Sequence, residues 1–194
     1  FTSDNGATHS HTAPLRDGKG TLYEGGIRVP AFMVGPGIPL GSETDTPVSS
    51  IDFFPTIAEL AGAESASVDG ESLVPLLLHS EELRREALFW HFPCYVGRGV
   101  PASAIRIGDW KLIEFFETQT VEVYNLAEDP GESRDLAAID PEHTRELRDK
   151  LKAWQRITQA PCPIERNPNY DPNARLLRGR NRRGLERHDT EAER

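Results

Sequence analysis

Two adjacent side chains near the start of the sequence carry oxygen atoms suited to a hard metal ion. Asp4 and Asn5 follow residues 1–3, which are typical of the end of a strand, and Gly6 completes a turn. Open α/β sheets bind ligands at the carboxyl ends of their strands. A carboxylate and an amide oxygen are suitable ligands for Ca²⁺ or Mg²⁺. Because an isolated Asp-Asn-Gly sequence is usually only a turn, a metal site needs support from another segment.

That support comes from the glycine-rich loop around Lys19. Lys19 stands between Gly18 and Gly20, where backbone can approach an anion closely, and its ammonium offers three hydrogen-bond donors. Residues 15–30, Leu-Arg-Asp-Gly-Lys-Gly-Thr-Leu-Tyr-Glu-Gly-Gly-Ile-Arg-Val-Pro, closely resemble a signature of the sulfatase family. In that family an Asp-Asn pair precedes such a loop, and a Gly-Gly-x-Arg-x-Pro turn starts the next strand. This chain matches that order.

The resemblance implies a role for each matched residue. Asp4 and Asn5 would be ligands of a divalent cation, Ca²⁺ or else Mg²⁺, and Lys19 would bind the sulfate oxygens. The substrate would be a sulfate ester, either an aryl or a carbohydrate sulfate. The family's nucleophile is a formylglycine, made from the first residue of a Cys/Ser-x-Pro/Ala-x-Arg motif that precedes the Asp-Asn pair. The resemblance also suggests a periplasmic or secreted protein.

Four later segments resemble the family too, so that the similarity extends from residue 1 to about residue 172. They are residues 51–57, 88–93, 110–113 and 124–132. In the first of them, Asp52 precedes a well-punctuated helix with Pro55 in its first turn and Gly62 just after its end. We interpret Asp52 as the N-cap of this helix, which would explain it without a functional role.

Three histidines are further candidates for contact with a substrate. His9 and His11 lie between the Asp-Asn pair and Lys19. His91 belongs to the small C-terminal sheet, which in the family packs near the mouth of the pocket. For each of them, an ordinary polar or packing role is the favoured interpretation.

No acceptable formylglycine motif occurs in the 194 residues. Cys94 and Cys162 have an Arg at the right separation, Arg98 and Arg166, but both lack the Pro or Ala at the third position of the motif, and both lie after the Asp-Asn pair. We therefore expect the nucleophile, the other metal carboxylates and the rest of the parallel sheet in a preceding N-terminal half of the same domain. This chain alone is then expected to be inactive. Two separated cysteines cannot form a zinc site by themselves, and we expect unpaired thiols.

Other function classes stay open beside the sulfatase interpretation. A related metal-dependent phosphatase or phosphodiesterase would share the sheet and the Asp-x-x-Pro helix start, but we would not expect it to carry the segment around Lys19. A non-catalytic module that binds an anion or calcium, or an inactive truncated product, would also be consistent with the residues present.

Charge and hydropathy exclude two kinds of partner. The net charge is −9, and seven Arg against four acidic residues in 173–194 leave 15 basic and 27 acidic residues in 1–172. An acidic body argues against nucleic acid, because phosphate binding needs clustered basic residues. No run approaches the roughly 18 apolar residues of a membrane span.

The patterning predicts an α/β fold in three parts. Residues 1–86 are expected to be the C-terminal part of an alkaline phosphatase-like parallel-sheet domain, with a buried strand over 27–34 after a Gly25-Gly26 turn and a charged helical stretch over 81–86. Residues 87–172 predict a small antiparallel sheet, with a hairpin at Gly108-Asp109, and one terminal amphipathic helix over 141–159. Residues 173–194 predict a disordered, Arg-rich tail.

Overall fold

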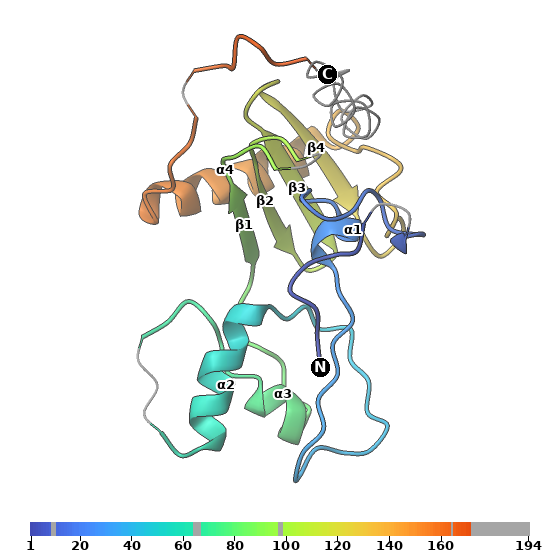
Figure 1. The fold of residues 1–194 in the computed structure, drawn as a ribbon, viewed down its shortest axis with the longest axis vertical. Coiled ribbons are helices and arrows are strands. Elements are labelled where there is room, and N and C mark those ends of the chain that lie inside the picture. The colour runs from blue at the N-terminus through green and yellow to red at the C-terminus, as the bar shows by residue number, and fades with distance from the viewer. Residues whose placement is uncertain (9–10, 64–66, 97–98, 164, 172–194) are drawn as a thin grey trace, which may run out of the picture.

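The computed structural model describes residues 1–8, 11–63, 67–96, 99–163 and 165–171 (Figure 1). His9 and the predicted disordered tail, 173–194, lie outside these residues. Two groups of elements follow one another along the chain. Two short helices form one end of the molecule in Figure 1, and an antiparallel sheet with a long helix forms the other.

The four-stranded sheet has the simplest topology, because each strand pairs antiparallel with the next. The strands are β1 (Leu88–Phe92), β2 (Ala102–Ile107), β3 (Trp110–Phe115) and β4 (Thr120–Asn125), in the order β1-β2-β3-β4. The predicted hairpin is confirmed: Ile107 pairs with Trp110, and Gly108 adopts a φ of +55° in the turn between them. The predicted small antiparallel sheet is therefore present.

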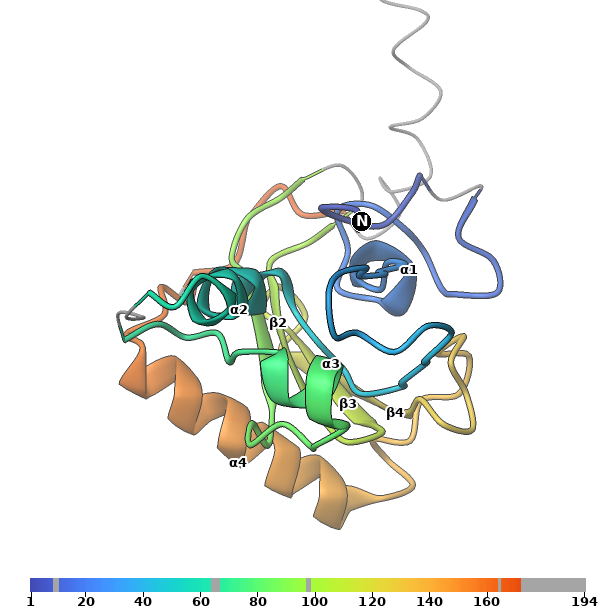
Figure 2. The same ribbon diagram turned by 90° about the horizontal axis from the view of Figure 1, so that it is seen from below.

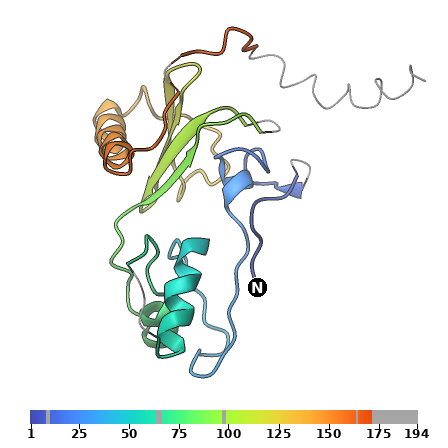
Figure 3. The ribbon, with the colours of Figure 1, turned by 60° about the vertical axis from the view of Figure 1, so that its left-hand side comes forward.

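Helix α4 (Pro141–Ile157) covers one face of the sheet, as Figure 2 shows. Its apolar stripe buries Leu147 and Leu151 against Ile105, Leu112 and Val123. The opposite face carries a second core of Ala104, Ile113 and Tyr124, and the segment leading into α1 (Glu24–Ile27) packs on it through Tyr23. Figures 2 and 3 show α1 and α4 on opposite sides of the sheet. The N-terminal segment thus uses the sheet face that α4 leaves free.

The other group of elements contains a 3₁₀ turn (Ser50–Asp52) that leads into α2 (Phe53–Leu60), and α3 (Val74–His79). The end of α2 agrees with the sequence, since Gly62 has a φ of +67° just past the helix. Asp52 holds the N-cap position of α2, as predicted, but its side chain makes no capping hydrogen bond to this helix. Its buried carboxylate instead accepts two hydrogen bonds from the Arg85 guanidinium, at 2.5 and 2.9 Å, and one each from the backbone N–H groups of Ser49 and Glu71.

The charged helical stretch expected over residues 81–86 is wrong, because no helix forms there. The backbone N–H groups of Arg84 and Arg85 donate to the Glu71 carboxylate at 2.7 and 2.9 Å. Long-range side-chain partners therefore replace the backbone pairing of a helix in this segment.

The predicted buried strand over residues 27–34 does not form either. Its one bridge within the described residues joins Ala31 to Thr2, and Phe32 and Val34 are 60% and 86% exposed. A strand needs neighbours to satisfy its backbone groups. In the part of the chain that the structure describes, this segment has only Phe1 and Thr2 as strand partners. The predicted Gly25-Gly26 turn is the single-turn helix α1.

Two smaller expectations concern cysteines and membrane spans. Cys94 and Cys162 are unpaired thiols, as predicted. Among the described residues, no helix combines the length and the apolar character that crossing a bilayer requires.

Candidate functional site

The structure brings the Asp4-Asn5 turn and the Lys19 loop together through their backbones. The N–H of Lys19 donates to the carbonyl of Ala7 at 2.9 Å, and the N–H of Gly6 donates to the carbonyl of Gly26 at 2.8 Å. Two segments that are separate in the sequence therefore form one backbone unit. The predicted cation ligands and the predicted anion-binding ammonium belong to this unit.

The three predicted side chains remain available for ligands. Asp4 and Lys19 are exposed and Asn5 is half-buried. Within the described part of the chain, none of the three side chains makes a hydrogen bond or an ion pair, although the Asn5 carbonyl accepts one from the Ser3 hydroxyl at 2.9 Å. Two adjacent oxygen donors without competing partners fit a hard cation, but they supply fewer than the 6–8 ligands of Ca²⁺. The described residues contain no group of three or more His, Cys, Asp or Glu side chains that would complete such a site.

Glycines make the close packing of this unit sterically feasible. A Cβ atom on Gly6 would lie 1.9 Å from the carbonyl oxygen of Gly25, and one on Gly26 would lie 2.2 Å from that of Thr21 and 2.7 Å from that of Gly18. Gly18 and Thr21 flank the Lys19 turn, which the Thr21 hydroxyl closes by donating to the Gly18 carbonyl at 2.9 Å. The glycines that carry the family resemblance are therefore contact points between backbones.

The candidate histidines lie in different parts of the molecule. His11 is exposed, with its Nδ1 3.5 Å from the Thr8 hydroxyl. The His91 ring lies on the α4 face of the sheet, with Nδ1 2.6 Å from the Ser103 hydroxyl and Nε2 3.2 Å from the Pro161 carbonyl, and its edge meets Trp154. The imidazole of His91 thus lies on the opposite side of the sheet from α1, and His9 lies outside the described residues.

A small hollow of about 180 Å³ lies beside the Lys19 turn. Its wall is formed by Gly20, Thr21, Leu22, Trp90, His91 and Phe92. Trp90 also packs against the core that contains Tyr23, so it lies on the α1 face of β1. The hollow therefore offers mostly apolar and aromatic surface next to a cationic turn.

Beneath α1 lies a buried charged network that the sequence analysis did not identify. The Lys111 Nζ atom, fully buried, lies 2.8 Å from the Glu24 Oε1 atom and 2.8 Å from the Glu132 Oε1 atom. The backbone N–H of Glu24 donates to the Glu132 Oε2 atom at 2.6 Å, and Arg106 lies 3.8 Å from the other oxygen of Glu24. Burial raises the pKa of the Glu132 carboxyl, against the opposing effect of the Lys111 ammonium. The sequence contained one indication that Lys111 is buried, because side chains two residues apart on a strand share a face and Ile113 is buried.

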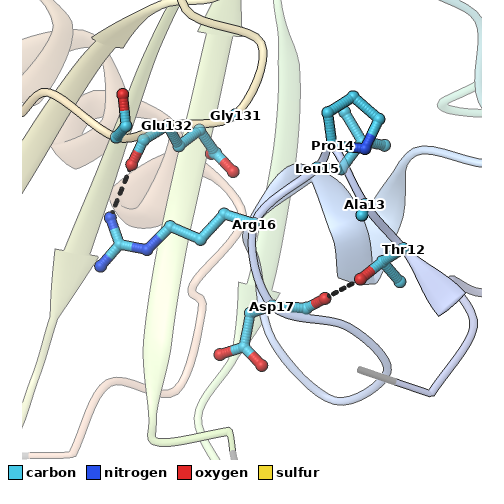
Figure 4. A pocket seen from close by; sticks show the side chains of 9 residues that line it. Thr12, Ala13, Pro14, Leu15, Arg16, Asp17, Gly131 and Glu132 are labelled. Carbon is cyan, nitrogen blue, oxygen red and sulfur yellow. Dashed lines mark hydrogen bonds between the residues drawn. The ribbon is translucent and has the colours of Figure 1, made fainter. Parts of the chain in front are cut away.

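Arg16 forms a second link between the N-terminal loop and the sheet region, and Figure 4 shows its guanidinium at the Glu132 carbonyl, in the segment after β4. Its guanidinium donates to the Tyr124 hydroxyl at 2.6 Å and to the Glu132 carbonyl at 2.9 Å, and it lies 4.0 Å from the Tyr23 ring centre. Burial raises the pKa of the Tyr124 hydroxyl, and its hydrogen bond to Glu122 raises it further. An open hollow of about 540 Å³ beside Arg16 is lined by residues 12–17 and 131–133. Because its polar contacts are made within the protein, Arg16 acts as a structural link.

Comparison with known proteins gives a consistent picture. Residues 17–160 match the family model for N-sulphoglucosamine sulphohydrolase, C-terminal. A sulfatase of Formosa agariphila is 39% identical over 186 residues, which cover 84% of this chain and 34% of that protein. Arylsulfatase A of Homo sapiens is 33% identical over 185 residues, covering 80% of this chain and 36% of that protein.

The fold agrees with these sequence matches. The crystal structure of Ps i-CgsB superposes with a TM-score of 0.69 at 29% identity, covering 79% of this chain and 35% of that one. The chain thus spans about a third of the length of the relatives it matches. It belongs to the sulfatase family, and it corresponds to the C-terminal region of that family's alkaline phosphatase-like fold.

Proposed function

We propose that the full-length protein containing this chain hydrolyses sulfate esters, with Lys19 binding the sulfate group and Asp4 and Asn5 serving as cation ligands. The observation that carries the proposal is the 2.9 Å hydrogen bond from the Lys19 N–H to the Ala7 carbonyl. It ties the oxygen-donor turn directly to the turn that presents the ammonium. A sulfate ester held at a cation site needs both kinds of group at once.

Each of these side chains has a chemical task in the proposed site. The Lys19 ammonium donates hydrogen bonds to the sulfate oxygens and offsets their negative charge. Further negative charge develops on the ester oxygen as its bond to sulfur breaks. The Asp4 carboxylate and the Asn5 amide oxygen would hold Ca²⁺ or Mg²⁺, which polarises the sulfate when bound. The nucleophile, a formylglycine, is expected outside this chain. We therefore expect no turnover from these 194 residues alone.

The organic part of the ester is expected to lie in the hollow beside the Lys19 turn. Leu22, Trp90 and Phe92 give this hollow an apolar and aromatic lining suited to one face of an aryl or sugar ring. Among the structural neighbours, one structure is Ps i-CgsB in complex with k-i-k-neocarrahexaose, and another is BT4656 in complex with D-glucosamine-2-N,6-O-disulfate. These complexes favour a carbohydrate sulfate, while the similarity to arylsulfatase A favours an aryl sulfate as the laboratory substrate.

A second candidate function is hydrolysis of a phosphonate monoester. The phosphonate monoester hydrolase of Agrobacterium radiobacter superposes with a TM-score of 0.60 at 27% identity over 82% of this chain. Both substrates are tetrahedral oxyanions, so Lys19 would serve either. Comparing kcat/KM for an aryl sulfate and for an aryl phosphonate monoester, in the same full-length enzyme, separates the two, and we expect the sulfate to be preferred.

The proposal is tested by Lys19→Ala in the full-length enzyme, with Lys150→Ala as the matched control. Lys150 lies on the exposed surface of α4, where it pairs with Glu146 at 3.0 Å. Removing an electrostatic group of the kind proposed for Lys19 lowers kcat by about 10²–10³-fold. We expect that loss for Lys19→Ala alone, together with a raised inhibition constant for inorganic sulfate. If both variants keep the parent's kcat/KM, Lys19 is an ordinary loop residue and the proposal fails.

A further inference from the structure

We propose that Lys111 is a positioning residue for the sulfate site, acting through Glu24 to hold α1 and the Lys19 turn in place. This inference rests on the proposed function of Lys19. Lys111 lies in β3, and within the described residues its ammonium bonds only to Glu24 and Glu132, not to the Lys19 turn or the Asp4-Asn5 turn. Its effect would therefore be transmitted by packed backbone.

The first step of that link is the network under α1. Glu24 is the first residue of α1, and its side chain and backbone N–H are held separately, by Lys111 and by Glu132. Lys111 and Glu132 are fully buried and Glu24 is 2% exposed. In such a site water competes little for these bonds, so their directions fix where α1 begins.

The second step runs from α1 to the Lys19 turn. The N–H of Gly25 donates to the carbonyl of Arg16 at 3.0 Å, which joins α1 to the residues just before that turn. Gly26 lies so close to Gly18 and Thr21 that even a methyl group would not fit between them. A displacement of α1 would therefore displace the backbone on both sides of Lys19.

The use of charged groups here is itself informative. A buried ion pair often contributes no more stability than apolar residues of the same volume, because both charges lose their hydration. Three of the four carboxylate oxygens of Glu24 and Glu132 accept hydrogen bonds. The remaining one, Glu24 Oε2, has no hydrogen-bond partner among the described residues and lies 3.8 Å from Arg106. A gain in stability therefore does not explain why charged side chains are buried under α1. The directional hydrogen bonds that they make, which set the orientation of α1, do explain it.

The test is a double-mutant cycle in the full-length enzyme. It combines Lys111→Met, which keeps the length of the side chain and removes its charge, with Lys19→Ala. Lys150→Met is the control, and kcat/KM for an aryl sulfate is measured per folded molecule, well below each melting temperature. Losing a residue that orients a binding group commonly costs about 10–100-fold. We expect that loss for Lys111→Met in the parent and a clearly smaller loss in the Lys19→Ala background. Some loss remains there because α1 also holds the Asp4-Asn5 turn, through the hydrogen bond from Gly6 to Gly26.

The possible outcomes separate this inference from the proposed function. Equal losses from Lys111→Met in both backgrounds, or no loss in the parent, would overturn the positioning role while leaving that of Lys19 intact. No loss from Lys19→Ala would overturn the proposed function, and this inference with it. If Lys111→Met does not fold, Glu24→Met decides by the same criteria, because it removes the carboxylate through which Lys111 acts while Lys111 keeps Glu132 as a partner.

Discussion

Replacing Gly26 by Ala tests how tightly α1 holds the Lys19 turn. The new Cβ atom would lie 2.2 Å from the Thr21 carbonyl oxygen and 2.7 Å from that of Gly18, whereas Cβ atoms essentially never come closer than 3.0 Å to another heavy atom. The backbones must therefore separate by at least about 0.8 Å, and overpacking of this kind destabilises by about 1–3 kcal/mol. Because the opposing atoms are backbone, no side-chain rotation relieves the clash.

The consequence for activity follows from that displacement. A misplacement of about 1 Å in a group that positions the substrate can cost about 10²-fold in rate. We expect kcat/KM of the full-length enzyme on an aryl sulfate to fall by about that factor in Gly26→Ala, measured well below its melting temperature. Gly35→Ala is the matched control, because its nearest contact would be an ordinary 3.7 Å to Ile38. A folded Gly26→Ala enzyme within threefold of the parent would refute the reasoning.

Two other predictions concern stability and are measured on the full-length protein. Asp52→Ala should lower the free energy of unfolding by about 3–5 kcal/mol, because it leaves the half-buried Arg85 without its carboxylate. Urea unfolding measures this, with the exposed Asp149→Ala as control, and a loss below about 1 kcal/mol would mean that the pair behaves like a surface ion pair. Because the folded pKa of Glu132 is raised, the folded state holds this proton to a higher pH than the unfolded chain. The contribution of Glu132 to the free energy of unfolding should therefore fall as the pH rises from 4.5 through the raised pKa. Glu132→Gln should remove that fall, and an unchanged pH profile would contradict it.

The sequence predicted correctly those turns and helices that depend on residues close together in the chain. The Gly108-Asp109 turn needs only a residue that tolerates positive φ between two β-rich segments, and both features are visible in the sequence. Helix α4 follows from the spacing of Leu147 and Leu151, which places both on one side of a helix. In these cases the nearest neighbours along the chain determine the structure.

Long-range pairing explains what the sequence analysis missed. Asp52 occupies the predicted N-cap position, but its carboxylate makes no capping hydrogen bond to α2. It pairs instead with Arg85, 33 residues away, and with the Glu71 backbone, 19 residues away. The Lys111 Nζ atom meets a carboxylate 87 residues earlier in the sequence and another 21 residues later. Periodicity carries no information about such contacts. Family resemblance identified the residues of the candidate site, but the backbone contacts that join its two turns became visible only in the structure.

The central claim is that Lys19 and the Asp4-Asn5 turn together form a site for a sulfate and a cation. A crystal structure of the full-length protein, grown with CaCl₂ and an aryl sulfate, tests it most directly. The account predicts the Lys19 Nζ atom at about 2.7–3.2 Å from a sulfate oxygen. It also predicts an oxygen of Asp4 and the amide oxygen of Asn5 at about 2.3–2.6 Å from one Ca²⁺ ion. A bound sulfate ester whose oxygens are contacted by other residues, with Lys19 in solvent and no cation at Asp4, would contradict it.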